Sequence, residues 1–169
     1  MNDFILFTAT LPAGSCTSFY REIMFWYCTV IVNSRFHIRR MMTRIALLLS
    51  GGALGTLARY GLSGLTHRLF GATFPLGTLI VNLVGSFTIG LLWGFWETNT
   101  LPASFRSFVF IGILGGFTTF STAMLETMNL FRDGETRLAL INILANNVLG
   151  IALVFLGFMA AKEVLTFLR

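Results

Sequence analysis

Charge is scarce in this sequence. Asp, Glu, Lys and Arg make up only 11% of the 169 residues, and 55% are hydrophobic. A soluble domain carries about 25% charged residues, so the charge here is too sparse to cover a surface that faces water. The mean hydropathy of +0.78 points the same way. The composition therefore indicates an integral membrane protein rather than a soluble enzyme or binding domain.

Cysteine and histidine are also rare. Both cysteines, Cys16 and Cys28, lie before residue 40, so the rest of the chain has neither a disulfide framework nor a thiolate metal site. His37 and His67 are far apart and lack neighbouring ligands. The net charge of +5 comes from basic residues spread between apolar runs, which fits anionic lipid head groups better than nucleic acid. Without a Ser–His–Asp set or paired carboxylates in the apolar part, we expect no hydrolytic enzyme.

Four long apolar stretches dominate the chain instead. A helix needs about 20 mostly apolar residues to cross the hydrocarbon core of a membrane. Suitable stretches occupy roughly residues 45–65, 74–96, 108–130 and 138–161. The connections between them are rich in charge and turn formers. Because these connections are short, neighbouring helices are expected to be antiparallel. The sequence thus predicts an all-α membrane protein with four transmembrane helices, formed by residues 42–169.

Residues 1–41 have a different character. The apolar run at residues 25–32 is flanked by Arg21 and Glu22 before it and by further arginines after it, and is too short to span a membrane. The order of basic and apolar residues is wrong for a signal peptide. We expect an N-terminal extension outside the core, with a short interfacial helix as the alternative.

The loop charges predict little bias in orientation. From Arg44 on, the basic residues on one side are Arg44, Arg106, Lys162 and Arg169, and those on the other are Arg68, Arg132 and Arg137. The positive-inside rule needs a clear excess, so such a chain can insert both ways. Arg35, Arg39 and Arg40 of the extension would favour an inside N-terminus.

Polar residues inside the spans carry the functional signal. Arg59 costs about 2.5–3.5 kcal/mol near a helix centre on insertion scales. Thr56 and Ser63 share its helix face, and a cation with two hydroxyls suits a wet vestibule that attracts anions. The alternative is that Arg59 snorkels to the head groups.

Other polar residues recur at helical spacing. Thr78, Asn82 and Ser86 form one polar stripe on the second span. The Asn82 amide has two donor hydrogens and an acceptor to satisfy. Asn142, Asn146 and Asn147 on the fourth span follow a similar pattern. Both sets either line a polar path or bond to another helix.

The third span predicts a broken helix. Gly115 and Gly116 precede a run rich in hydroxyls, which is a poor sequence for an unbroken helix. A break near its middle exposes carbonyls and N–H groups that must meet protein, water or ions. Such breaks build cation sites from carbonyls and anion sites from N–H groups. The alternative is helix packing through Gly112 and Gly116.

Three motifs resemble those of the CrcB/Fluc fluoride channels in order and spacing. They are residues 51–60 (Gly-Gly-Ala-Leu-Gly, then Arg-Tyr at 59–60), 77–85 (Gly-Thr-Leu-Ile-Val-Asn-Leu-Val-Gly) and 115–122 (Gly-Gly-Phe-Thr-Thr-Phe-Ser-Thr). The resemblance covers about residues 42–168. It implies a multi-pass protein of the cell (inner) membrane that exports fluoride from the cytoplasm, which lowers fluoride toxicity. It also implies an antiparallel, dual-topology homodimer with two narrow pores.

The resemblance also implies roles for individual residues. A structural sodium ion would be held by main-chain carbonyls of Gly115 and Thr118. The implied fluoride pathway comprises Asn82, Phe120, Thr78, Ser121, Thr122, Arg59 and Asn147. There are two departures from the family pattern: Ala123 replaces a second pore phenylalanine, and Ile143 and Asn147 of the fourth span replace Tyr and Ser. A lower rate, altered selectivity or a different partner subunit would each fit these departures.

The chemistry of fluoride fits these residues, and two rival functions fit them less well. A narrow pore must replace the water around fluoride with strong donors, which amides, hydroxyls and N–H groups supply, while phenyl edges add weaker stabilisation. A small proton-coupled multidrug exporter needs a carboxylate in its first span, where this chain has Arg59. A non-conducting membrane assembly protein leaves Arg59 and the predicted break unexplained.

Overall fold

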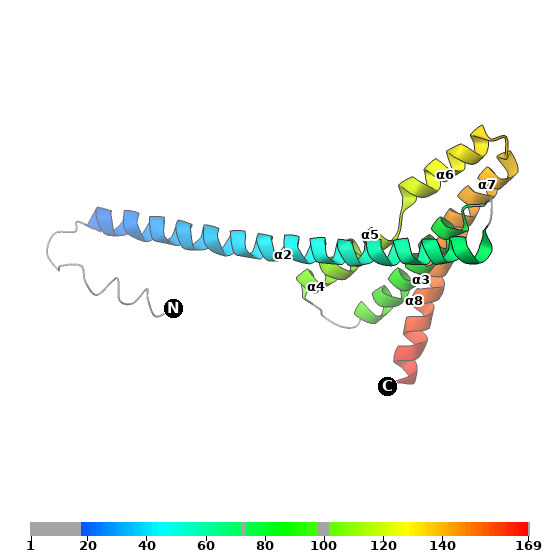
Figure 1. Cartoon of the computed structure of the whole chain (residues 1–169). Helices are drawn as coiled ribbons and strands as arrows, with labels where there is room; N and C mark the ends of the chain where they lie inside the picture. Colours follow the sequence, from blue (N-terminus) through cyan, green and yellow to red (C-terminus); the bar gives the residue numbers. More distant parts are fainter. Residues whose placement is uncertain (1–17, 72–73, 98–101, 169) are drawn as a thin grey trace. The chain divides into compact units, whose positions relative to one another are not determined.

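The described part of the chain is helical. The computed structural model describes residues 18–71, 74–97 and 102–168, with side chains from residue 38 onward. The helices are α2 (Ser18–Phe70), α3 (Leu76–Trp96), α4 (Ala103–Ser107), the π-helical turn η1 (Phe108–Leu114), α5 (Gly115–Phe117), α6 (Phe120–Arg132), α7 (Thr136–Leu144), the π-helical turn η2 (Ala145–Leu149) and α8 (Gly150–Phe167) (Figure 1).

Four of the described helical stretches are long and apolar enough to cross a membrane. They are Ile38–Phe70, Leu76–Trp96, Ala103–Arg132 and Thr136–Phe167. Each contains one of the apolar stretches found in the sequence, apart from the first two residues of the second stretch, which lie before Leu76. Three of the four are several residues longer than predicted. The prediction of four spans in an all-helical protein is therefore confirmed.

The chain divides into two compact units, Met1–Thr43 and Arg44–Arg169. Residues 1–17 of the predicted extension lie outside the described residues. Residues 18–43 are helical, because α2 begins at Ser18 and does not end until Phe70. All the contacts described below lie within the second unit.

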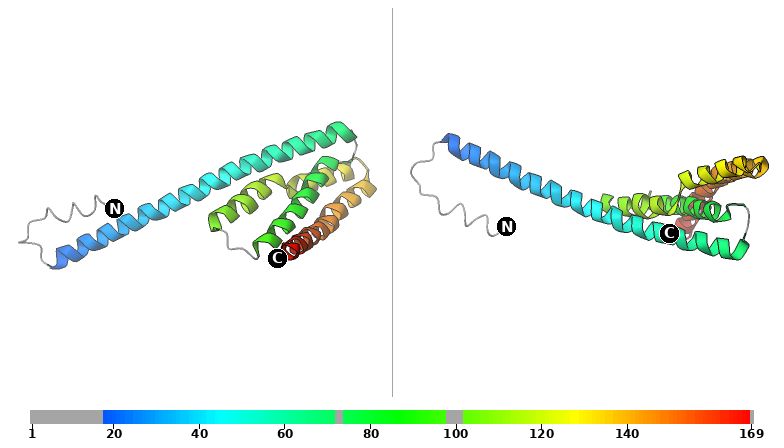
Figure 2. Two further views of the ribbon diagram at one scale, coloured as in Figure 1. Left: turned by 90° about the horizontal axis from the view of Figure 1, so that it is seen from below. Right: turned by 45° about the horizontal axis from the view of Figure 1, so that its top comes forward.

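Glycines bring α3 and α8 together. These two helices run side by side in Figure 2 and are in close contact. A Cβ added to Gly157 would lie 2.8 Å from Leu91 N and still closer to the Phe87 carbonyl oxygen, and one added to Gly90 would collide with the Val154 carbonyl. Small residues of this kind let helix backbones approach closely in membranes.

A second set of glycines packs α2 against the third span. A Cβ on Gly51 would lie 2.8 Å from the Phe108 carbonyl oxygen, and one on Gly116 would lie 2.7 Å from the Gly52 carbonyl oxygen. A Cβ on Gly112 would lie 3.1 Å from Gly51 Cα. Gly112 and Gly116 are therefore packing residues, as the alternative interpretation of this motif proposed.

The second unit has a small core and an apolar exterior. Val81, Ala123, Ala139 and Ala161 are fully buried, whereas many large apolar side chains are exposed, including Leu49, Ile111 and Phe155. Soluble proteins rarely expose contiguous apolar surface on this scale. The exterior is therefore suited to contact with lipid or with another membrane protein.

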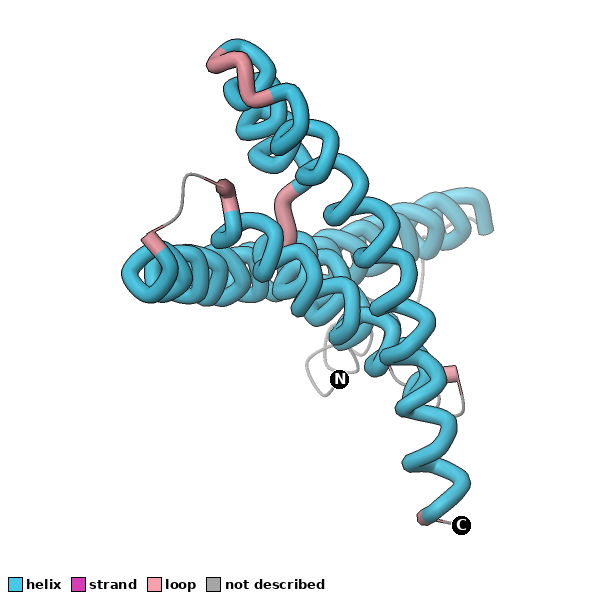
Figure 3. Tube along the Cα trace, turned by 90° about the vertical axis from the view of Figure 1, so that its right-hand side faces the viewer, coloured by secondary structure: helices cyan, strands magenta, loops and turns pink. Residues whose placement is uncertain are grey.

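The third span contains two residues with extended backbone. Helix α5 ends at Phe117, Thr118 and Thr119 have φ/ψ of −78°/155° and −149°/111°, and α6 begins at Phe120. Figure 3 draws this segment as loop between two helices. Gly115 is itself helical, with φ/ψ of −65°/−35°. The extended residues thus follow the glycine pair, and the Thr119 side chain caps α6 by accepting from Thr122 N–H.

The contact between α3 and α8 yields a stability test. Gly157→Ala forces a methyl group against the backbone of α3, so we expect it to lower the unfolding free energy by about 1–3 kcal/mol. Gly52→Ala is the matched control, because a Cβ there has no atom of another helix within 4 Å among the described residues. Chemical unfolding in mixed micelles, followed by tryptophan fluorescence, measures both variants. Equal stability of the two variants would contradict this packing.

Candidate functional site

Asn82 and Thr119 form a pair of hydrogen bonds between α3 and the start of α6. The Thr119 N–H donates to Asn82 Oδ1 at 2.8 Å, and Asn82 Nδ2 donates to the Thr119 carbonyl at 3.1 Å. The carboxamide therefore binds both main-chain polar groups of a residue that has left the helix. Since unpaired backbone groups are costly at membrane depth, this pairing stabilises the extended segment.

The same segment releases main-chain carbonyls from helical bonding. In an α-helix each N–H donates to the carbonyl four residues earlier. Thr119 N–H binds Asn82 instead of the Gly115 carbonyl, and Thr122 N–H binds Thr119 Oγ1 at 3.4 Å instead of the Thr118 carbonyl. Arg59 Nε donates to the Gly116 carbonyl at 3.2 Å. Gly115 and Thr118 thus present carbonyls that have lost their helical donors.

A cavity lies beside this segment, and we call it the Asn82 cavity. It has a volume of about 380 Å³ and contains five of the predicted site residues: Asn82, Phe120, Asn147, Gly115 and Thr118. Its remaining lining residues are Gly85, Ser86, Ile89, Phe110, Leu114, Thr119, Ala123 and Asn146. Three stretches distant in sequence, residues 82–89, 110–123 and 146–147, therefore meet around one space that contains several polar groups.

A second cavity contains Arg59 and is called the Arg59 cavity. It has a volume of about 230 Å³ and is lined by Thr56, Arg59, Tyr60, Ser63, Thr78, Val81, Thr119 and Thr122. Thr119 lines both this cavity and the Asn82 cavity, so the two are neighbours. The structure thus brings Arg59, Thr78 and Thr122 together, whereas Ser121 is exposed and lines none of the three cavities described here.

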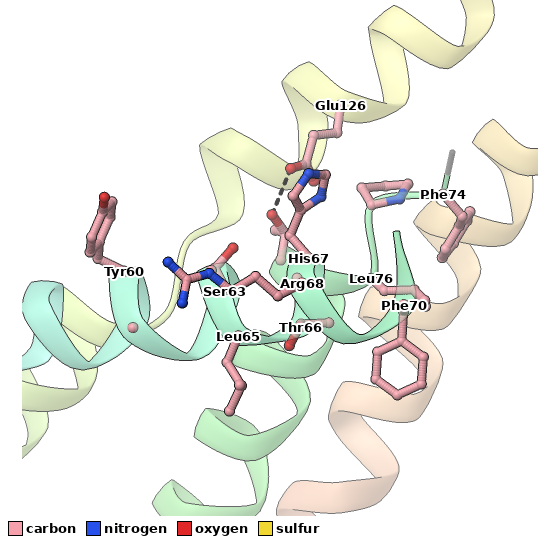
Figure 4. A pocket seen from close by; sticks show the side chains of 15 residues that line it. Tyr60, Ser63, Leu65, Thr66, His67, Arg68, Phe70, Phe74, Leu76 and Glu126 are labelled. Carbon is pink, nitrogen blue, oxygen red and sulfur yellow. Dashed lines mark hydrogen bonds between the residues drawn. The ribbon is translucent and has the colours of Figure 1, made fainter. Parts of the chain in front are cut away.

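The third cavity, the Glu126 cavity, lies at the end of α2 and has a volume of about 700 Å³ (Figure 4). It shares Tyr60, Ser63 and Thr78 with the Arg59 cavity. Thr78 Oγ1 donates to Glu126 Oε1 at 2.6 Å, the dashed line in Figure 4. The other carboxylate oxygen of Glu126 is buried without a hydrogen-bond partner among the described residues. Shared lining residues therefore connect the three cavities in sequence.

Three residues of this region were not among the predicted site residues. Thr119 pairs with Asn82, Asn146 Oδ1 accepts from Asn82 Nδ2 at 2.8 Å, and Glu126 binds Thr78. The sequence placed Asn146 on a polar face without deciding between a path and an interhelical bond; the structure shows an interhelical bond to a residue of the cavity. Glu126 could have been singled out as the lone acid of its span.

The departures from the family pattern have structural counterparts. Ala123 is fully buried, and its carbonyl accepts from Asn142 Nδ2 at 3.3 Å. Asn147 Nδ2 donates to the Ile143 carbonyl of its own helix at 2.8 Å. Asn146 and Asn147 both lie on the π-helical turn η2, a type of turn frequent at functional sites.

This set of groups can stabilise a small anion. The cavities contain carboxamide and hydroxyl donors and a guanidinium, and the first turn of α6 has N–H groups without intrahelical partners. The N-terminus of a helix also favours negative charge. The phenyl ring of Phe120 adds a polarised edge.

Comparisons with known proteins agree with this chemistry. The family described as "CrcB-like protein, Camphor Resistance (CrcB)" matches residues 46–158. The chain is 44% identical over 128 residues to the "Fluoride-specific ion channel FluC" of Parabacteroides distasonis, covering 76% of this chain and 100% of that protein. It is 47% identical over 118 residues to the protein of the same name from Dehalococcoides mccartyi, covering 69% and 90%. It is 49% identical over 118 residues to that from Opitutus terrae, covering 66% and 86%. The resemblance of the three motifs is confirmed, and this multi-pass membrane protein belongs to the CrcB-like family.

Proposed function

We propose that this protein is a fluoride-selective channel through which fluoride leaves the cytoplasm passively. The observation that carries the proposal is the meeting of Asn82, Phe120 and the extended segment around one cavity, next to the cavity of Arg59. The relatives named as fluoride-specific ion channels support the identity of the ion. Since the protein acts as a channel, it catalyses no covalent chemistry.

The residues have distinct roles in this proposal. The guanidinium of Arg59 raises the local anion concentration, and its bond to the Gly116 carbonyl fixes its position. The Thr122 hydroxyl is a donor beyond it, and the Thr78 hydroxyl becomes one when its hydrogen turns away from Glu126 Oε1. Asn82 then provides amide hydrogens, one of which binds Asn146 Oδ1 when no anion is present. Together these donors replace the hydration shell of fluoride within a narrow space.

The active assembly is an antiparallel, dual-topology homodimer. Phe120 follows directly on the extended segment and is 69% exposed, and Ser121 is exposed beside it. Non-helical backbone at membrane depth is tolerated only inside protein or beside a water-filled cavity, so a second copy is expected to cover this face. The near balance of basic residues on the two sides allows insertion in both orientations.

A structural sodium ion is the expected cofactor of this dimer. Gly115 and Thr118 are the residues that would hold it, and both have carbonyls released from helical bonding. Carbonyl oxygens suit a hard cation. The side-chain hydroxyl of Thr118 donates to the Leu114 carbonyl, so the main-chain carbonyl is the group of Thr118 that would hold the ion. When bound, the ion supplies a fixed positive charge near the anion path.

Fluoride efflux tests the proposed function directly. We expect liposomes that contain the purified protein to release fluoride rapidly and to retain chloride, because amide, hydroxyl and guanidinium donors suit the smaller, more strongly hydrated anion. Ion-selective electrodes measure both anions after the membrane potential is collapsed with a potassium ionophore. Equal release of the two anions, or release of neither, would overturn the proposal.

Asn82→Asp tests the role of the carboxamide. A fixed carboxylate repels the anion and cannot donate to Thr119, so fluoride efflux should fall by at least about 100-fold. Asn129→Asp is the matched control. This substitution makes the same change in charge, and Asn129 lies on α6 outside the three cavities. Wild-type efflux in Asn82→Asp would remove Asn82 from the pathway.

A further inference from the structure

An apolar groove opens between α3, the third span and α8. It has a volume of about 770 Å³ and lies along the half of the third span that precedes the extended segment. Most of its lining side chains are large and apolar, among them Ile89, Trp93, Phe110, Ile111, Phe155 and Phe158. Ile89 and Phe110 also line the Asn82 cavity, so the groove continues directly from that cavity.

One face of α6 has no covering element among the described residues. Its large apolar side chains are exposed and lie within one arc of the helix: Phe120, Leu125, Met128 and Phe131. Ser121 is exposed within the same arc. The buried residues Ala123 and Thr127 lie on the opposite side of α6, where Asn142 of α7 binds both of them (Figure 1). The exposed face of α6 therefore needs lipid or another protein against it.

Two-fold symmetry brings this face and the groove to the same depth in the membrane. A two-fold dimer buries the same patch on both copies, so the exposed Phe120 places the axis beside the extended segment. Rotation about that axis in an antiparallel pair exchanges the two halves of the third span. Residues 119–132 of one copy therefore lie at the depth of residues 103–114 of the other. Since Phe120 lines the cavity from which the groove continues, α6 of the second copy begins at the inner end of the groove.

We propose that α6 of a second copy lies in the apolar groove and that Ser121 of the partner subunit completes the anion path beside Asn82. The symmetry makes this exchange mutual, so each path combines Asn82 of one chain with Ser121 of the other. The inference rests on the proposed function, because it supposes a fluoride channel that is an antiparallel dimer.

The Ser121 hydroxyl is suited to this role. It makes no hydrogen bond among the described residues, so its hydrogen is available to an anion. Ser121 lies in the first turn of α6, directly after Phe120, and this turn of the second copy meets the groove where the groove joins the Asn82 cavity. Supply from the second copy also explains why Ser121 lines none of the three cavities of its own chain.

A lipid is the rival occupant of the groove. Arg106 lines the groove and has no hydrogen bond or ion pair among the described residues, so its guanidinium suits a lipid phosphate. The join between the groove and the Asn82 cavity favours a second copy. An acyl chain at this join would set hydrocarbon against the amides and carbonyls of the cavity, whereas α6 of a second copy brings a hydroxyl there.

Linked dimers test which chain Ser121 serves. Two full-length copies of opposite orientation are joined by a linker with one spanning helix, because the C-terminus of one copy and the N-terminus of an inverted copy lie on opposite sides. The same-copy dimer has Asn82→Asp and Ser121→Ala in one chain. The split dimer has Asn82→Asp in one chain and Ser121→Ala in the other. Both dimers contain the same two substitutions, so each is the matched control for the other.

The proposal predicts different rates for the two dimers. In the split dimer both substitutions fall in one path, and the other path keeps Asn82 and Ser121. In the same-copy dimer each path has one substitution, so initial fluoride efflux should be about five- to tenfold slower than in the split dimer, the effect of losing one hydrogen-bond donor. Equal rates, or a faster same-copy dimer, would overturn the proposal. Absence of fluoride release by the unlinked wild type would instead refute the proposed function.

Cysteine cross-linking tests the position of α6 without a linker. In a chain whose native Cys16 and Cys28 are replaced by serine, Ile111→Cys with Leu125→Cys should yield a covalent dimer in membranes under a short bismaleimide. Ile111→Cys with Leu49→Cys is the control pair. Leu49 is close in sequence to Gly51, which packs on the first half of the third span, so in an inverted copy it lies at the opposite depth. Absence of the covalent dimer with the first pair, or equal yields with both pairs, would place something other than α6 in the groove and overturn the proposal.

Discussion

The pairing of one carboxamide with one backbone residue governs this structure. Asn82 binds the N–H and the carbonyl of Thr119, two groups that neither lipid nor helix satisfies at that point. Without this pair the extended segment would leave polar groups unpaired at membrane depth, at several kcal/mol each. With it, the third span can leave the helix for two residues, release the carbonyls of Gly115 and Thr118, and begin a new helix at Phe120.

Glycine packing determines where this pair can form. The close contact of Gly51 and Gly52 with the third span holds α2 next to the extended segment, so Arg59 reaches the Gly116 carbonyl. The guanidinium thereby satisfies a backbone oxygen and contributes positive charge to the neighbouring cavity. Helix packing, the pairing of backbone groups and the position of the positive charge thus depend on the same few contacts, and a change in one is expected to disturb the others.

The sequence predicted the spans well because the membrane imposes a simple requirement on length and hydropathy. It also singled out Asn82, since an amide in an apolar stretch must be paired. The position of the extended residues was harder to predict, because glycine also tolerates helical backbone and Gly115 is helical here. The residue that caps α6 is Thr119, and its position depends on the hydrogen bonds with Asn82 on another helix.

The rest of the site depends on tertiary contacts that local sequence does not encode. The four-residue spacing of Asn142 and Asn146 placed them on one face, but only the position of α3 and α6 shows which groups they bind. The π-helical turn that carries Asn146 and Asn147 had no signal in the sequence. Of the predicted pathway residues, Ser121 lies apart from the three cavities, at an exposed position on α6. In the proposed dimer, a second copy would cover this position.

The central claim is that the Asn82 carboxamide, which is hydrogen-bonded to the main chain of Thr119, also binds the anion. Nuclear magnetic resonance of the protein in bicelles, with ¹⁵N-labelled asparagine and threonine, tests this most directly. The account predicts that added fluoride shifts the side-chain amide signals of Asn82 and the backbone amide signal of Thr119, while the same concentration of chloride leaves both unchanged. Signals that respond to neither anion, or equally to both, would contradict it.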